Sequence, residues 1–121
     1  MNETRECVTI EYQDGIPIIT VDTDLRGDDL DKFKNSFRDA IENYKRIVVV
    51  VGENNFLYDE FIAISVSGLK NAQRQDVKIA LVCAPQHQYE MLEVIRLTKV
   101  FTVFRSLEEA IAHLTDEKGE G

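Results

Sequence analysis

The chain has 121 residues, of which 44% are hydrophobic and 30% charged, and its formal net charge at pH 7 is −8. These values are typical of one globular domain with a single core. The negative charge argues against DNA, RNA or an anionic membrane surface as partner, since those require cation-rich faces, and it permits a basic protein partner.

No signal peptide and no apolar run of roughly 20 residues is evident, so we expect a cytoplasmic protein. In that reducing compartment, Cys7 and Cys83 are expected to be buried thiols.

The first part of the chain predicts a β-hairpin. Residues 8–12 alternate between apolar and polar, Asp14-Gly15 is a hairpin turn signal, and residues 16–21 form the return strand. Pro17 has no amide donor, so we expect this end of the strand not to be fully paired within the sheet.

An acidic segment follows the hairpin. It carries Asp22, Asp24, Asp28, Asp29 and Asp31 against one cation, Arg26. The segment is either a solvated loop or an acidic edge that docks a partner.

The remaining chain alternates between helices and strands. Apolar side chains at three- and four-residue spacing predict a helix over residues 28–44, and its apolar stripe contains Leu30, Phe33, Phe37, Ala40, Ile41 and Tyr44. The unbroken apolar run 47–51 predicts a central strand that is covered on both faces. Further elements are expected as a helix over 59–73, a strand over 78–83, a helix over 88–97 with Met91, Leu92 and Ile95 inward, a strand over 99–104, and a last helix that Ser106 caps.

This order predicts the α/β class, with a mixed sheet of about five strands and about four helices. We expect one domain over residues 1–121, with its core at 8–112 and a frayed tail at 115–121. Gly68, inside the second helix, indicates close packing of that helix against the sheet.

Familiar catalytic and cofactor motifs are missing from the sequence. The six glycines form no phosphate-binding loop, and His87 and His113 stand apart from each other and from the cysteines, so neither a cofactor nor a metal is expected. No set of residues assembles an acid, a base and an orienting group, and we expect no enzyme. A response-regulator receiver would need an acidic pair directly after its first strand and a lysine after its last parallel strand. Here Asp22 and Asp24 follow the second strand of a hairpin, and Lys99 opens a strand, so a receiver is disfavoured.

Three segments, taken with the element order, resemble the STAS domain of anti-sigma factor antagonists. They are "VDTDLRGDDLDKF", "RIVVVVGENNFLYDEF" and "MLEVIRLTKVFTVFRSLEEAI", and the resemblance covers roughly residues 8–112. The family's motif D-S-[SF] places a serine at the start of the second helix. The resemblance implies that an anti-sigma factor kinase phosphorylates this serine and that the phosphate blocks binding to the same partner.

This sequence departs from the motif at the serine. Aligning Asp59 with the motif aspartate puts Glu60 in the serine position and requires one extra loop residue; without that residue, Asp59 itself takes the position. Either residue is an acid that cannot be phosphorylated stably by a serine kinase. The acids are helix caps, a permanent mimic of the modified state, or a simple loss of switching, and capping is compatible with either of the other two.

The resemblance implies a regulatory module that binds an anti-sigma factor, a serine kinase-like ATP-binding protein or another STAS protein. The expected binding residues are Asp24, Arg26, Asp28, Asn55, Phe56, Tyr58, Asp59 and Glu60. Phe56 and Tyr58 either anchor a partner or fill the space beneath the second helix. Alternative functions are a STAS subunit of a membrane transporter or of a stressosome-like assembly, and, from a different class, a small nucleotide-binding protein or enzyme.

Overall fold

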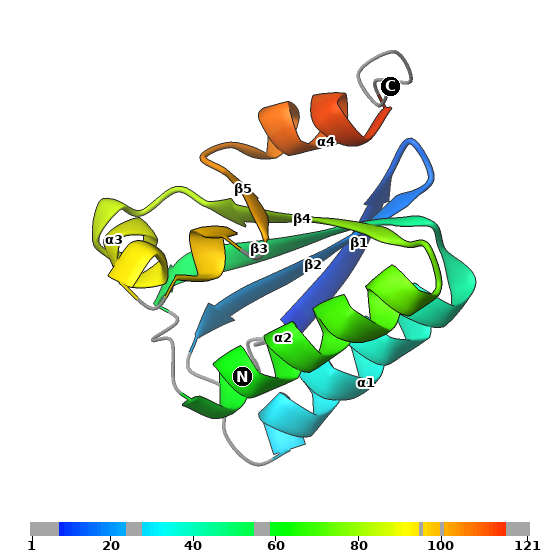
Figure 1. Ribbon diagram of the computed structural model, residues 1–121, viewed down its shortest axis with the longest axis horizontal. Helices are drawn as coiled ribbons and strands as arrows, with labels where there is room; N and C mark the ends of the chain where they lie inside the picture. The colour runs from blue at the N-terminus through cyan, green and yellow to red at the C-terminus, as the bar shows by residue number, and fades with distance from the viewer. Residues whose placement is uncertain (1–7, 24–27, 55–58, 95, 100, 116–121) are drawn as a thin grey trace, which may run out of the picture.

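The structure is a computed structural model that describes residues 8–23, 28–54, 59–94, 96–99 and 101–115. In this part of the chain, five strands form one sheet and four α-helices cover it (Figure 1). The strands are β1 (Val8–Gln13), β2 (Ile16–Thr23), β3 (Arg46–Asn54), β4 (Lys78–Cys83) and β5 (Thr102–Phe104). The helices are α1 (Asp28–Asn43), α2 (Asp59–Arg74), α3 (Gln86–Val94) and α4 (Leu107–Thr115), and a short 3-10 helix, η1, spans Leu97–Lys99. The predicted α/β class, with five strands and four helices, is confirmed.

The strands lie in the sheet in the same order as in the sequence, β1-β2-β3-β4-β5. β1 is antiparallel to β2, and the other three pairings are parallel. β3 is the central strand, as its unbroken apolar run predicts. Pro17 pairs with Tyr12 of β1, whereas the described pairing of β2 with β3 begins at Ile18, so the missing amide donor falls outside the parallel ladder.

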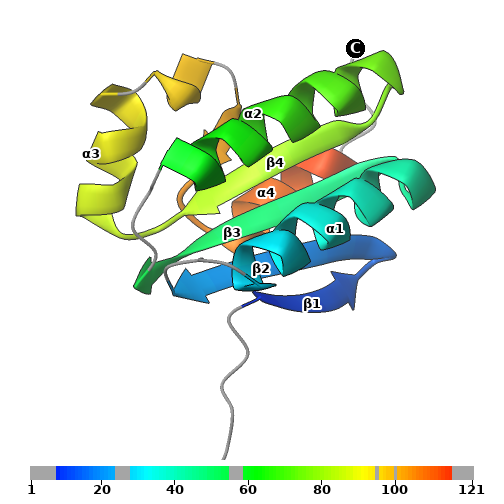
Figure 2. The ribbon, with the colours of Figure 1, turned by 90° about the horizontal axis from the view of Figure 1, so that it is seen from below.

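Helices cover both faces of the sheet. Figure 2 shows α1 and α2 side by side on one face, with α4 behind the sheet on the other. Successive β3 residues alternate between two cores: Ile47, Val49 and Val51 pack under α1 and α2, and Val48 packs with α4. This alternation explains why β3 is apolar at every position from 47 to 51, because each face of this run is buried against a helix layer.

Three phenylalanines join α1 to α2 within the larger core. The rings of Phe33 and Phe37 have centroids 5.6 Å apart, and those of Phe33 and Phe61 are 5.1 Å apart. Gly68 of α2 lies directly over Phe37: a Cβ atom at this position would be 2.7 Å from Phe37 Cδ2 and 3.0 Å from Phe37 Cζ. Close packing at Gly68 is therefore confirmed, but the expected contact with the sheet is wrong, because the residue that Gly68 meets belongs to α1.

The segment after β4 differs most from the sequence-based expectation. The helix α3 begins two residues earlier than predicted, and its Met91 is 47% exposed rather than inward, whereas Leu92 is fully buried as expected. Lys99 belongs to η1, not to a strand, because β5 pairs with β4 only from Thr102 to Phe104. The expected inward position of Ile95 lies outside the described residues.

Candidate partner-binding site

The starts of three helices meet at one edge of the sheet. β2, β3 and β4 are parallel, and α1, α2 and α3 each follow one of them, so all three helices begin at the carboxyl edge of these strands. In open α/β sheets this edge is where ligands usually bind. The topology therefore brings the start of α1 and the start of α2 to the same edge, although they are about thirty residues apart in the chain.

The predicted site residues are only partly described. Asp28 is the first residue of α1 and is exposed, and Asp59 and Glu60 are the first two residues of α2. The predicted start of the second helix is therefore confirmed, while the roles of its acids stay predictions. Five other expected binding residues lie outside the described part of the chain: Asp24, Arg26, Asn55, Phe56 and Tyr58.

The start of α1 is strongly acidic. Asp28, Asp29 and Asp31 all stand in its first turn. The positive end of the helix dipole stabilises such carboxylates, typically by about 0.3–1 kcal/mol each at exposed positions. The same residues therefore stabilise the helix and add negative charge to this edge of the sheet.

A buried glutamine holds α3 against the end of β3. Gln88 is 3% exposed, and its Nε2 donates a hydrogen bond of 3.3 Å to the carbonyl oxygen of Gly52. Gly52 precedes the segment that leads to α2, so this contact sets the position of α3 relative to the proposed site. Sequence reasoning missed this role, because a single glutamine in a weakly amphipathic helix does not indicate burial.

Arg105 fastens the start of α3 to β4 and β5. Its Nε donates to the carbonyl of Cys83 at 2.9 Å, and its Nη2 donates to the carbonyl of Ala84 at 2.7 Å and to Gln86 Oε1 at 3.1 Å. The guanidinium also lies over the ring of Tyr89, 4.5 Å from its centroid, in a cation–π contact. Arg105 thus satisfies carbonyl groups at the end of β4 that lie beyond the last pairing of β4 with β5.

The thiol of Cys83 is buried in this region and makes no disulfide. Burial raises its pKa to about 11, and the nearby Arg105 guanidinium opposes the shift. A thiol with this pKa is almost wholly protonated at neutral pH and is a poor nucleophile. Cys83 is therefore a core residue, as expected; Cys7 lies outside the described residues.

Apolar side chains are exposed on α3. Met91 is 47% exposed and Val94 is 74% exposed. Both follow the turn that Gln88 and Arg105 hold in place, so the structure places exposed apolar surface on the helix that follows β4. Single exposed apolar residues are common on protein surfaces, and no periodic pattern of apolar residues separates these two from the core.

Within the described residues, no group of three or more His, Cys, Asp or Glu side chains could hold a metal ion. A search of the same part of the chain also finds no helix with the length and apolar character needed to cross a membrane.

No protein-family model matches the sequence, and no curated protein matches it significantly. Solved structures match the fold. The chain superimposes on the crystal structure of an anti-sigma factor antagonist from Mycobacterium paratuberculosis with a TM-score of 0.73 and 13% identity, over 88% of this chain and 91% of that one.

A candidate anti-sigma factor antagonist from Thermotoga maritima gives a similar result. Its crystal structure matches with a TM-score of 0.73 and 19% identity, over 88% of this chain and 92% of that one. The NMR structure of the same Thermotoga protein matches with a TM-score of 0.70 and 17% identity, over 92% and 90% of the two chains. The chain therefore has the STAS fold of anti-sigma factor antagonists across nearly its whole length.

Proposed function

We propose that the chain is a non-catalytic regulatory module that binds another protein in the manner of an anti-sigma factor antagonist. The observation that carries the proposal is the shared fold, which spans about nine-tenths of both chains in each comparison. The arrangement of the helix starts agrees with it, because acidic α1 and the Asp59-Glu60 start of α2 meet at one edge of the sheet.

The proposed partner is an anti-sigma factor of the ATP-binding serine kinase type, or another STAS protein. The proposed binding face comprises Asp24, Arg26 and Asp28, the segment 52–58, and the first residues of α2. Its negative charge suits a partner with a basic surface, and such complementarity speeds association and selects the correct partner.

We further propose that this module is not switched by phosphorylation at the usual position. The resemblance to the D-S-[SF] motif puts Asp59 or Glu60 in the position of the phosphoacceptor serine, and the start of helix α2 at Asp59 supports this alignment. Phosphate on a serine would add about −1.5 to −2 charges at a helix start, where the dipole favours them. A fixed carboxylate supplies part of that charge permanently, and it can cap the helix at the same time.

A binding experiment tests both statements. The full chain is measured by biolayer interferometry against a panel of anti-sigma-type serine kinases, first unaltered and then as Glu60→Lys, with Glu42→Lys on the exposed surface of α1 as the matched control. We expect at least one kinase to bind and Glu60→Lys to change its affinity about tenfold, which corresponds to about 1.4 kcal/mol at an interface. Affinity that is the same for both variants and the unaltered chain would contradict the proposed face.

Phosphorylation is measured in the same samples. After incubation with the bound kinase and ATP, mass spectrometry should find no stable phosphate at residue 59 or 60 of the unaltered chain, and phosphate should appear in Glu60→Ser or Asp59→Ser. Stable phosphate at an unaltered acid would refute the loss of switching. If no kinase binds but a STAS protein does, the module belongs to a stressosome-like or transporter-associated assembly instead.

A further inference from the structure

A groove runs between α1 and α2 on the side of these helices that faces away from the sheet. It has a volume of about 570 Å³. Its floor is apolar and includes Phe37 and Ile41, both 2% exposed, and it is closed at its base where Gly68 meets the Phe37 ring. Figure 2 shows the two helices lying next to each other along this face.

Cations occupy both rims of the groove. Lys34 and Arg38 stand on α1, Lys70 and Arg74 stand on α2, and all four are exposed. None of the described residues that line the groove is acidic. This local excess is unusual in a chain with 22 acidic and 14 basic residues.

The spacing of these cations is the same on the two helices. Each pair is separated by four residues, Lys34 to Arg38 and Lys70 to Arg74, so each pair spans about 6 Å of one helix face. Like charges at this spacing destabilise an isolated helix. Repulsion within the two pairs therefore lowers the stability of the free protein, and an acidic ligand in the groove would neutralise this repulsion.

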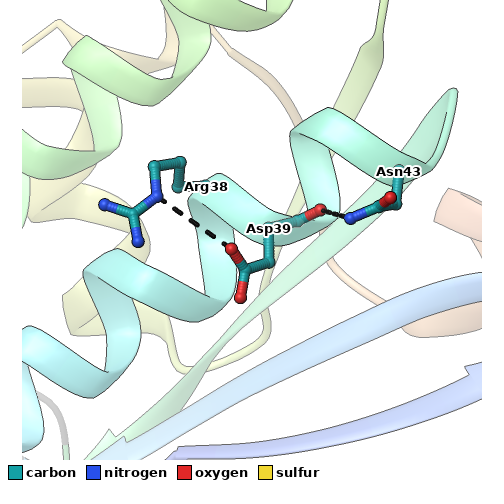
Figure 3. A network of polar contacts seen from close by, with 3 residues as sticks. All are labelled: Arg38, Asp39 and Asn43. Atoms are coloured by element: carbon teal, nitrogen blue, oxygen red, sulfur yellow. Dashed lines mark hydrogen bonds and ion pairs between the residues drawn. The ribbon is translucent and has the colours of Figure 1, made fainter.

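The cations are held only weakly within the chain. Arg38 Nε is 4.0 Å from the carboxylate of the neighbouring Asp39, and the two side chains are 51% and 68% exposed (Figure 3). Exposed ion pairs of this kind contribute little to the stability of the fold. Asn43 Nδ2 donates to the Asp39 carbonyl oxygen at 2.8 Å, and Arg74 Nη2 donates to the amide oxygen of Asn71 at 3.3 Å.

A second groove on the other side of α1 offers a comparison. It has a volume of about 480 Å³ and lies between α1 and the first two strands, where Tyr12 and Tyr44 contribute to it. Its described lining contains one carboxylate, Asp39, and no cation. The positive charge is thus a property of the α1–α2 groove and not of α1 as a whole.

We propose that the α1–α2 groove binds an acidic amphipathic helix of a partner protein. The apolar stripe of that helix would pack on Ala63, which is exposed, and Ile64, which is partly buried, above the covered floor of the groove. Acids four residues apart on its flanks would meet the two cation pairs. A helix suits this surface because neighbouring helices pack at 8–10 Å with side chains in each other's grooves. An extended peptide would need backbone partners, which the hydrogen-bonded helices α1 and α2 do not offer.

Charge favours a short acidic helix over an anionic membrane. The apolar residues of the groove are recessed between charged rims, whereas a membrane-binding face presents apolar residues outward. The net charge of −8 would also repel an extended anionic surface. A single helix senses mainly the charges within a Debye length of about 8 Å at physiological ionic strength, where the four cations dominate. This inference does not rest on the proposed anti-sigma-type partner.

The test uses a designed helical peptide of about 18 residues, roughly five turns, with a leucine stripe flanked by glutamates. Matched peptides replace the glutamates with lysine or the leucines with alanine. Amide chemical shifts of the full chain locate the binding site, and fluorescence anisotropy gives the affinity at two salt concentrations. We expect the leucine–glutamate peptide alone to bind, to shift amides of α1 and α2, and to bind more weakly at higher salt.

Variants of the chain then separate charge from shape. Lys34→Glu and Lys70→Glu should each weaken binding about fivefold and the double variant at least about tenfold, since reversal replaces attraction with repulsion. Ser67→Trp, which fills the groove from an exposed position, should also weaken it. Lys99→Glu, at an exposed position outside the groove, is the matched control and should bind as the unaltered chain does.

Several results would overturn the proposal. These are no binding, shifts confined to other elements, or an affinity that charge reversal leaves unchanged. Concentration-dependent association of the chain with itself through the α1 and α2 amides would identify a second copy as the occupant. Binding of phosphatidylglycerol vesicles that depends on the same four cations and displaces the peptide would identify a membrane instead.

Discussion

Replacing Gly68 with alanine tests how tightly α1 and α2 are packed. Alanine favours a helix over glycine by about 1 kcal/mol, so the local preference alone predicts a more stable protein. The new Cβ would, however, be 2.7 and 3.0 Å from two carbon atoms of the Phe37 ring. That ring is 2% exposed and stacks on Phe33, so it cannot swing away without disturbing the core.

Overpacking of this kind costs about 1–3 kcal/mol, and contact with several atoms of one fixed ring favours the upper end. After the gain in helix preference, we expect a net loss of about 1–2 kcal/mol in the free energy of unfolding. For a domain of this size, the melting temperature should fall by roughly 4–8 °C. Urea unfolding followed by circular dichroism measures the loss, and an unchanged dependence on urea shows that the same surface unfolds.

Two further variants isolate the contact between Gly68 and Phe37. Ser67→Ala changes the preceding, exposed position of the same helix and should leave stability unchanged or raise it by about 0.5 kcal/mol. Phe37→Leu combined with Gly68→Ala should cost less than the sum of the single changes, because the leucine relieves the clash. If Gly68→Ala is as stable as Ser67→Ala, Phe37 does not restrict the residue at position 68.

Two other properties can be measured on the same protein. Ser106 Oγ accepts a hydrogen bond of 3.2 Å from the Glu109 amide. Ser106→Ala should therefore lower the free energy of unfolding by about 1 kcal/mol, whereas Ser106→Thr should largely retain the stability of the unaltered chain. Equal stability of all three proteins would argue against the cap. In a Cys7→Ser background, Cys83 should react with a disulfide reagent at pH 8 only after unfolding, because with a pKa of about 11 only about one thiol in a thousand is ionised. The thiol ionises with a pKa near 9.0 in the unfolded protein and about 11 in the folded protein. Its contribution to stability is therefore fully present below about pH 9 and is lost as the pH rises from about 9 toward 11, because the unfolded state releases its proton first. Rapid labelling of the folded protein would show that the thiol is accessible.

The elements predicted most accurately from the sequence are those that are buried on both faces or that begin with a clear capping residue. The strand 78–83 has the predicted bounds, and Ser106 caps α4 as the capping-box spacing indicated. Met91 shows the limit of this reasoning. An apolar residue in a short helix is buried only if another element covers it, and in α3 Leu92 is covered while Met91 is not.

The candidate site was predictable in position but not in detail. The sequence placed acids at the starts of α1 and α2, and the parallel strands bring those starts to one edge. The roles of Gln88 and Arg105 depend on carbonyl groups thirty-six and twenty-two residues away in the chain. No local pattern reports contacts over such separations. The cationic groove is likewise a product of how α1 lies beside α2, and Gly68 was its one local signal.

The strand order has a consequence for how the chain can fold. Every strand pairs with the strand that precedes it in the sequence, so the sheet can grow by adding one strand at a time to an existing edge. Parallel pairing is normally slow because distant segments must first meet. Here each crossover contains a single α-helix, with the short η1 in addition between β4 and β5, and a chain leaving the ribosome would find the partner of each new strand already in place. The hairpin of β1 and β2 would then serve as the template on which the remaining sheet is built, strand by strand.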